Sequence, residues 1–134
     1  MSKVVNRRNS ADALLSVTKA LPAADASNTS DAIEIGNAGP HREGIKLRVS
    51  WPANSVLVAT KTLTITLQSS ATSTLADATG PGSTHVITGD TGFPAGYVDF
   101  ELGQNIGAFV GWKQAVQAAG GDNTGTTLTG TIIK

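Results

Sequence analysis

Residues 61–69, KTLTITLQS, decide the fold class of this chain. Leu63, Ile65 and Leu67 alternate with polar residues, and this period of two is typical of a β-strand with one apolar face. The polar positions are mostly threonine, whose β-branched side chain suits a pleated, half-buried surface. The pattern predicts a strand that turns its aliphatic face to a core and its hydroxyl face to water or to a partner.

Other segments of the chain repeat this alternation. In residues 45–51, IKLRVSW, one face of the predicted strand is apolar throughout: Ile45, Leu47, Val49 and Trp51. Further strands are predicted in residues 32–35, 83–89, 96–103, 105–116 and 126–134. Glycine, proline and asparagine separate these segments, and their spacing of about ten residues indicates a β-sandwich or a β-barrel.

The chain has the length of a single domain. A fold of 134 residues buries roughly two thirds of its unfolded surface, and a second autonomous core is not expected. We divide the chain into an N-terminal arm or edge segment, residues 1–30, and a β-sandwich domain, residues 31–134. Within the first segment, residues 10–21 fit either a helix or an edge strand, and we favour the strand. Residues 112–123 fit either a helical turn or a continuation of the preceding strand.

The charge balance limits the kinds of partner. Ten basic and ten acidic residues give zero formal net charge, whereas domains that neutralise nucleic-acid phosphates concentrate positive charge. Direct binding to nucleic acid is therefore not expected. Only the N-terminal tip is locally basic, with Lys3, Arg7 and Arg8. Such a tip is usually a solvated arm, and otherwise it docks on an acidic surface.

Two absences in the sequence exclude further classes. There is no cysteine, so disulfides and cysteine-based metal or redox sites are excluded. No apolar run approaches the ~20 residues that a membrane helix needs, and the start of the chain lacks the apolar region of a signal peptide. A soluble product with no membrane partner and no evident export signal is expected.

No residue pattern indicates a metal site or an active site. His41 and His85 lie 44 positions apart without ligand spacing, so we interpret both as ordinary surface or turn histidines. Asp99 and Glu101 share one strand face ~7 Å apart, a spacing that could serve a glycosidase pair, but solvent-facing charges are the simpler interpretation. Residues 120–125, GGDNTG, lack the acidic positions of a calcium loop and are interpreted as a hairpin turn. We expect no enzyme activity, catalytic residue, metal or cofactor.

Aromatic residues and threonines indicate what the surface of the sandwich offers. Trp51 and Trp112 both fall on core-facing positions, which leaves few aromatic side chains for stacking on a sugar. A carbohydrate-binding β-sandwich module stays as an alternative, and it predicts exposed aromatic residues. The threonine-rich outer faces are flat and uncharged, and oligomerisation is one way to cover such faces beside open strand edges.

Residues 36–44, GNAGPHREG, join two of the predicted strands. Gly39 and Pro40 suit a chain reversal, because proline restricts its own backbone and that of the residue before it. The charged or titratable residues at the exposed end of this loop are His41, Arg42 and Glu43. We interpret the segment as a contact loop, not as a catalytic one.

The order of the segments carries a family resemblance. The leader DALLSVTKALPAADASNTSDAIEIGNAG, residues 12–39, precedes EGIKLRVSW, residues 43–51, and KTLTITLQSSATSTLADA, residues 61–78. GFPAGYVDFELGQNIGAFVGW, residues 92–112, and GGDNTGTTLTGTIIK, residues 120–134, follow. Over roughly residues 11–134, this order resembles the small jelly-roll capsid cement (decoration) proteins of tailed bacteriophages. The basic start MSKVVNRR has no counterpart in the family pattern.

The resemblance implies both a fold and a role. The implied fold is an all-β, single-domain, jelly-roll-like β-sandwich of about eight antiparallel strands, to which the residues of this chain add an extended N-terminal arm. The implied role is that of a non-enzymatic virion structural protein, which binds the outer surface of the phage head, bridges major capsid subunits and stabilises the shell. A tail or baseplate β-sandwich component is the alternative within the virion.

The partners and location follow from the same resemblance. The expected partners are the major capsid protein and further copies of this chain, as a homodimer or homotrimer at capsid symmetry axes. The expected location is the outer capsid surface of the virion, after synthesis in the host cytoplasm. The residues from which we expect contacts are Val4, Val5, Arg7, Arg8, His41, Arg42 and Glu43.

Overall fold

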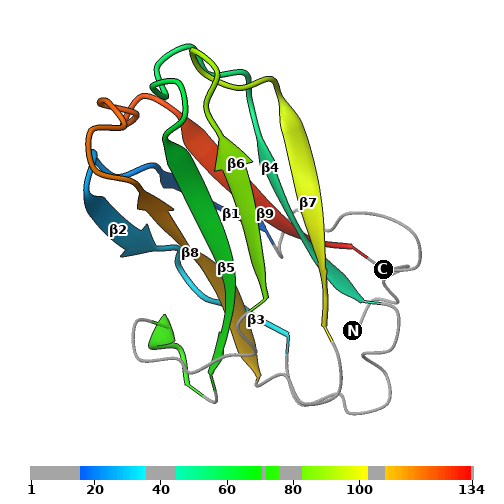
Figure 1. The fold of residues 1–134 in the computed structure, drawn as a ribbon. Coiled ribbons are helices and arrows are strands. Elements are labelled where there is room, and N and C mark those ends of the chain that lie inside the picture. Colours follow the sequence, from blue (N-terminus) through cyan, green and yellow to red (C-terminus); the bar gives the residue numbers. More distant parts are fainter. Residues whose placement is uncertain (1–15, 36–44, 71, 76–82, 103–107, 134) are drawn as a thin grey trace.

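The structure is a computed structural model that describes residues 16–35, 45–70, 72–75, 83–102 and 108–133. These residues form nine strands in two antiparallel sheets and no helix, which confirms the predicted all-β sandwich (Figure 1). The first sheet contains β1 (Ser16–Ala20), β9 (Thr127–Ile133), β4 (Lys46–Trp51) and β7 (Gly96–Glu101). The second contains β2 (Ala26–Thr29), β3 (Ile33–Glu34), β8 (Phe109–Val116), β5 (Thr62–Ser70) and β6 (Thr84–Thr88).

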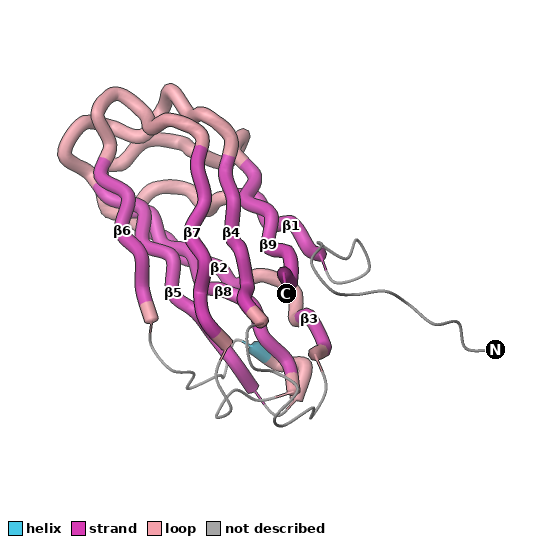
Figure 2. Tube along the Cα trace, turned by 90° about the vertical axis from the view of Figure 1, so that its right-hand side faces the viewer, coloured by secondary structure: helices cyan, strands magenta, loops and turns pink. Residues whose placement is uncertain are grey.

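The strand pairings have jelly-roll order. Laid out as one long hairpin, the chain pairs β1 with β9, β2 and β3 with β8, β4 with β7, and β5 with β6. Wrapping this hairpin brings β9 beside β4 and β8 beside β5. The resulting orders are β1-β9-β4-β7 in one sheet and β2-β8-β5-β6 in the other, seen from the side in Figure 2. Two wrapped Greek keys of this kind define the jelly roll.

Strands β2 and β3 occupy one strand position, so nine strands fill the eight positions that a jelly roll requires. Both pair with β8, and the register between them slips by one residue. Residues 30–32 stand opposite only Gly111 and Trp112, which makes a β-bulge. The Ser30 hydroxyl accepts a hydrogen bond from the Trp112 amide at 3.1 Å and so keeps the ladder satisfied across the bulge.

The core lies between the two sheets and is lined by the predicted alternation. Leu63, Ile65 and Leu67 are at most 1% exposed, and the intervening residues of β5 are half-buried on the other face. Trp51 and Trp112 are buried at 9% and 0% exposure, which confirms the prediction that both face the core. A Cβ atom on Gly130 of β9 would collide with the Trp112 ring, so this glycine makes room for the largest core side chain.

The N-terminal segment contributes one strand to each sheet. Residues 16–20 form β1, in agreement with the favoured strand interpretation, and residues 26–29 form β2, which was not predicted. Both strands lie at sheet edges. Residues 112–123 were open between a helical turn and a continuation of the preceding strand, and they are extended as part of β8 up to Val116.

The connection from β8 to β9 corrects one sequence interpretation. Residues 120–125 were expected to form a hairpin turn, but β8 and β9 belong to different sheets. The connection therefore crosses from one layer of the sandwich to the other. Thr124 donates from its amide and its hydroxyl to Asp122 Oδ1, at 3.2 and 2.7 Å, which closes a local turn within the crossing.

Candidate interaction surfaces

The seven residues from which contacts were expected lie outside the described residues. They belong to the N-terminal segment and to the loop of residues 36–44: Val4, Val5, Arg7, Arg8, His41, Arg42 and Glu43. The candidate surfaces below are therefore built from the strands and from the described loops that join β4 to β5, β6 to β7 and β8 to β9.

The outer face of the first sheet carries two cross-strand ion pairs. Arg48 on β4 donates to both carboxylate oxygens of Asp99 on β7, at 2.7 and 3.0 Å. Lys46 and Glu101, the next pair along the same two strands, approach to 3.8 Å. The bidentate pair has the planar match that makes arginine–carboxylate contacts strong, whereas Glu101 is 76% exposed and its pair is weak.

These contacts decide the electrostatics of the two carboxylates. The hydrogen bonds from Arg48 and its positive charge lower the pKa of Asp99, and the same contact raises the pKa of Arg48. Asp99 is therefore ionised at neutral pH. The interpretation of Asp99 and Glu101 as solvent-side charges is confirmed, since Phe100 between them is buried at 5% exposure.

Tyr97 is the one aromatic residue that the described part of the chain exposes strongly. Its side chain is 56% exposed, and the Arg48 guanidinium lies 4.0 Å above the ring centroid. One face of the ring is thus already occupied by an arginine that is itself tied to Asp99. With both tryptophans in the core, the stacking platform expected of a carbohydrate-binding module is reduced to this single ring.

His85 differs from its sequence interpretation as an ordinary surface or turn residue. It lies within β6 and its half-buried ring stacks on Trp51 of the opposite sheet, with centroids 5.7 Å apart and planes inclined by 25°. The Trp51 indole donates to the Pro94 carbonyl at 3.1 Å. Along β6, His85 alternates with the exposed Thr84 and Val86 and so lies on the core-facing side of the strand. This alternation is the sequence signal that the interpretation as a surface residue left unused.

The outer face of the second sheet is dominated by hydroxyl groups. Alternation along each strand and the register between strands place seven serine and threonine residues next to one another on this face. We call it the hydroxyl face, and these residues are Ser27, Thr29, Thr62, Thr64, Thr66, Thr84 and Thr88. Lys113 and Glu34 are the charged residues that the described strands add on this side. The strict alternation of β5 predicted its hydroxyl side, but the sequence did not show which strands extend it.

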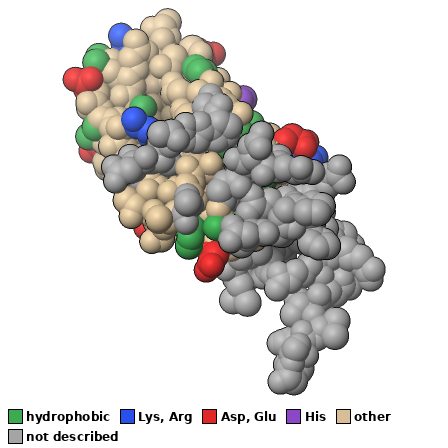
Figure 3. Space-filling model, turned by 90° about the horizontal axis from the view of Figure 1, so that it is seen from below, with side chains coloured by type: hydrophobic (Ala, Val, Ile, Leu, Met, Phe, Trp, Pro, Cys, Tyr) green, Lys and Arg blue, Asp and Glu red, His purple; other side chains and the backbone are tan. Residues whose placement is uncertain are grey.

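Charged side chains of the described strands and loops form no patch of one sign on the face shown in Figure 3. This view is from below, and its blue and red side chains stand among tan atoms where the described residues are visible. Within the described ranges, no three histidine, aspartate or glutamate residues gather where they could hold a metal ion.

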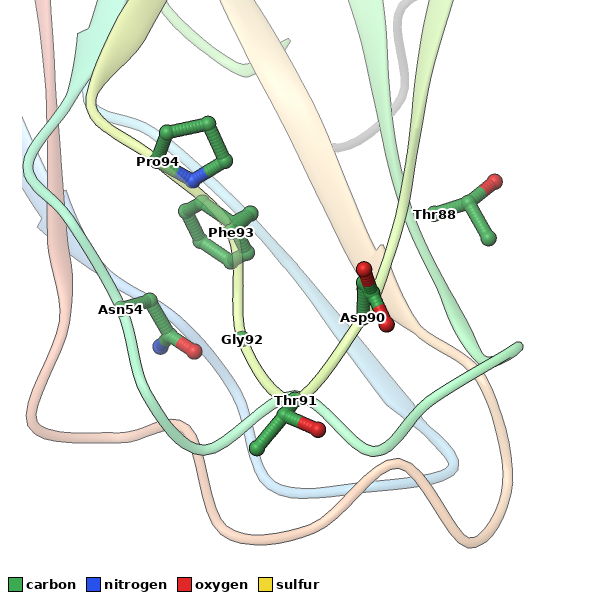
Figure 4. A pocket seen from close by; sticks show the side chains of 7 residues that line it. All are labelled: Asn54, Thr88, Asp90, Thr91, Gly92, Phe93 and Pro94. Atoms are coloured by element: carbon green, nitrogen blue, oxygen red, sulfur yellow. The ribbon is translucent and has the colours of Figure 1, made fainter.

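A shallow pocket of about 300 Å³ opens at the end of the sandwich where the β4–β5 and β6–β7 connections lie (Figure 4). Its wall comes mainly from the connection between β6 and β7, and its lining residues are Asn54, Thr88, Asp90, Thr91, Gly92, Phe93 and Pro94. Asp90 is its single carboxylate, and the Asn54 amide is already committed to hydrogen bonds inside the protein. The pocket therefore offers few free polar groups to a ligand.

The Asn54 side chain links two connections at this end, β4–β5 and β8–β9. Its Oδ1 atom accepts from the amides of Val56 and Leu57 at 2.8 and 2.9 Å. Its Nδ2 atom donates to Asn123 Oδ1 at 3.1 Å and to Thr126 Oγ1 at 2.6 Å. Because both polar atoms of this buried amide are paired, the hydrogen-bond network holds these loops in one arrangement.

Comparison of the sequence with models of protein families and with curated proteins gave no match. Among the described residues, no helix has the length and apolar character needed to cross a membrane.

Proposed function

We propose that the protein is a non-enzymatic virion structural protein, a capsid cement protein that binds the outer surface of a tailed-phage head. The observation that carries this proposal is the hydroxyl face. It is a broad surface of short, nearly uncharged side chains on a rigid antiparallel sheet.

The chemistry of this face suits docking against a protein surface. A hydroxyl group both donates and accepts hydrogen bonds and rotates to suit its partner, so it can be paired in many interfaces. Short threonine side chains lose little rotamer freedom on burial, compared with lysine or glutamate. Burying such a face therefore costs less desolvation and less entropy than burying an ordinary charged surface.

A cement protein gains from repetition as much as from single contacts. Many copies on a lattice, or one copy that touches two capsid subunits, convert modest contacts into high avidity. Zero formal net charge avoids mutual repulsion where copies crowd together. In this proposal the partners are the major capsid protein and neighbouring copies of the chain, and neither a cofactor nor nucleic acid takes part.

The proposal predicts that the purified protein cosediments with expanded, DNA-free heads of its phage and raises their resistance to heat. Thr64→Glu and Thr66→Glu place charges in the middle of the hydroxyl face and should weaken head binding by roughly tenfold or more, because each charge must be desolvated on docking. Thr129→Glu on β9, an outward threonine of the other sheet, is the matched control and should bind as the wild type does.

Three outcomes would count against this assignment. Heads that neither retain the wild-type protein nor gain heat resistance exclude the cement role. Binding to purified tails or baseplates, with none to heads, would instead support a tail or baseplate component. Equal weakening by the Thr64 and Thr129 substitutions would show that the hydroxyl face is not the docking surface.

A further inference from the structure

The sandwich has four edge positions, and three of them are guarded against strand addition. An open edge presents unpaired backbone groups, and native proteins protect such edges by charge, by bulges or by covering them. On β1, the Ala20 carbonyl accepts from the side chains of Gln114 and Asn28, at 2.7 and 3.1 Å. Lys19 on the same strand pairs with the buried Leu128 and so occupies a core-facing position, which is an inward-pointing charge at an edge.

Two further edges are guarded by a bulge and by acidic residues. The β2–β3 edge is interrupted by the bulge at residues 30–32. The edge of β7 carries Asp99 and Glu101, so a second copy of β7 laid antiparallel against it would bring acidic residues together.

The β6 edge has none of these devices. Its sequence, THVIT, holds no acidic residue, lysine, arginine or proline. Its pairing with β5 is regular over all five residues. Within the described part of the chain, no strand pairs with its outer side, and Figure 2 shows β6 at the margin of the molecule.

The hydrogen-bond pattern identifies the open backbone groups. The Gly89 amide donates to the Lys61 carbonyl at 2.7 Å, and the Leu67 amide donates to the Ser83 carbonyl at 2.8 Å. In an antiparallel ladder the residues bonded to one neighbour alternate with those bonded to the other. Thr84, Val86 and Thr88 therefore direct their amides and carbonyls away from β5.

These open groups are held in place by the core side of the same strand. His85 stacks on Trp51, and Ile87 packs against the hydrophobic core. Gly89, directly after the strand, packs so close to Leu57 and Val58 that a Cβ atom would meet them at 2.6–2.9 Å. The edge is thus preorganised, and pairing along it carries a small ordering cost.

We propose that β6 is the self-association edge of the protein and that its occupant is β6 of a second copy, antiparallel about a two-fold axis at Val86. Val86 then faces its own copy, Thr84 faces Thr88 of the partner, and each facing pair exchanges two hydrogen bonds. This inference rests on the proposed function, in which copies of the cement protein associate with one another. It identifies β6 as the strand that mediates their association.

Symmetry and charge favour a second copy over other occupants. Val86 is the middle one of the three residues whose backbone groups point away from β5. A two-fold axis at Val86 therefore pairs the amides and carbonyls of all three at once. Side chains that face themselves across a two-fold axis must not be charged, and the β6 edge meets this condition. Val86 is 51% exposed and would be covered by its own counterpart. The two second sheets would then join into one continuous sheet, with their hydroxyl faces on one side.

The first test measures the mass of the purified full-length protein over a concentration series. The wild type should reach twice the 13.6 kDa of one chain. Val86→Lys and Val86→Glu should each raise the dissociation constant of the dimer by roughly tenfold or more, because like charges meet at the axis. An equimolar mixture of the two variants should restore the dimer, and Val58→Lys, a change at a loop valine that is 43% exposed, should leave it intact.

The second test uses the absence of cysteine from the chain. Val86→Cys introduces the only thiol, and facing residues of a hydrogen-bonded antiparallel pair lie about 5.5 Å apart between Cα atoms, within disulfide range. Mild oxidation should link Val86→Cys copies quantitatively, and Val58→Cys copies should remain largely unlinked. Links formed equally by both variants would overturn the proposed pairing.

A wild-type protein that stays monomeric, or dimers that persist in Val86→Lys, would also overturn it. Head binding by a monomeric wild type would refute this inference and leave the cement role standing. A β6-mediated dimer that binds no heads would refute the role and leave the inference standing.

Discussion

Arg48 is the residue whose contacts have the clearest consequence for pH dependence. It lowers the pKa of Asp99 by two hydrogen bonds and by its charge. A carboxyl group whose pKa is lower in the folded state stabilises the protein above its unfolded pKa of ~3.9. That contribution is lost as the pH falls through the lower, folded-state pKa.

Arg48→Met should therefore raise the pKa of Asp99 towards its ordinary value. The free energy of unfolding should then fall less steeply as the pH is lowered. Carboxyl carbon shifts followed by NMR during an acid titration measure the pKa, and urea unfolding at neutral and acidic pH measures the stability. Lys46→Met is the comparison variant and should raise the pKa of Asp99 less, because Lys46 acts on Asp99 only by its charge and its own partner Glu101 is 76% exposed. An unchanged Asp99 titration in Arg48→Met would contradict the assignment of the shift to this contact.

At the scale of elements, a single buried amide fastens the edge strand β1 to the opposite sheet. Gln114 on β8 is 0% exposed, and it donates to the Ala20 carbonyl at 2.7 Å. Its Oε1 atom accepts from the Trp112 indole at 2.9 Å. The side chain thus satisfies polar groups of two elements and links the two layers of the sandwich.

Gln114→Ala should destabilise the protein by about 3 kcal/mol, because it leaves the Trp112 indole unpaired in the core and opens a cavity. Hydrogen exchange should show lost protection first in β1, whose remaining ties are its ladder with β9 and the Asn28 contact. Urea unfolding gives the free energy, and Lys113→Ala on the exposed side of β8 should stay within ~0.5 kcal/mol of the wild type. If Gln114→Ala lowered the free energy of unfolding no more than Lys113→Ala does, the Gln114 side chain would not anchor β1.

The elements also show how far the sequence predicts the fold. Alternation of apolar and polar residues, strictest in β5, located β4, β5, β7 and β9, because one face of each is buried and the other is not. β2, with the sequence ASNT, has little strand propensity and is extended because β8 offers it a backbone ladder. Leu75 lies between the predicted strands of residues 61–69 and 83–89, outside any predicted element, yet it is 3% exposed and packs where Gly111 leaves room for it.

Surfaces were predictable only in part, because a face is assembled from strands distant in sequence. The threonines of β5 were predicted to face outward, but their neighbours on β2 and β6 follow from the jelly-roll order. The pairing of Arg48 with Asp99 likewise depends on the register of β4 with β7. His85 was misjudged for the same reason, since its partner Trp51 comes from the opposite sheet.

For the whole molecule, the balance of charge separates two ways in which the proposed cement protein would bind a phage head. Formal net charge is zero, and the hydroxyl face adds only Lys113 and Glu34 from the described strands. The basic N-terminal residues Lys3, Arg7 and Arg8 would instead act on an acidic surface by charge. Salt distinguishes the two, because the Debye length falls from ~10 Å at 0.1 M to ~3 Å at 1 M.

We expect head binding to change by less than about threefold over this range of salt, because hydrogen bonds and packing of uncharged groups are weakly screened. Quantitative cosedimentation at a series of salt concentrations makes the measurement, and the double variant Arg7→Ala, Arg8→Ala is compared at each of them. Equal salt curves for the variant and the wild type would assign docking to the face of the sheet. A steep fall in wild-type binding that the variant lacks would assign it to the basic N-terminal segment, since only screened charge contacts weaken in that way.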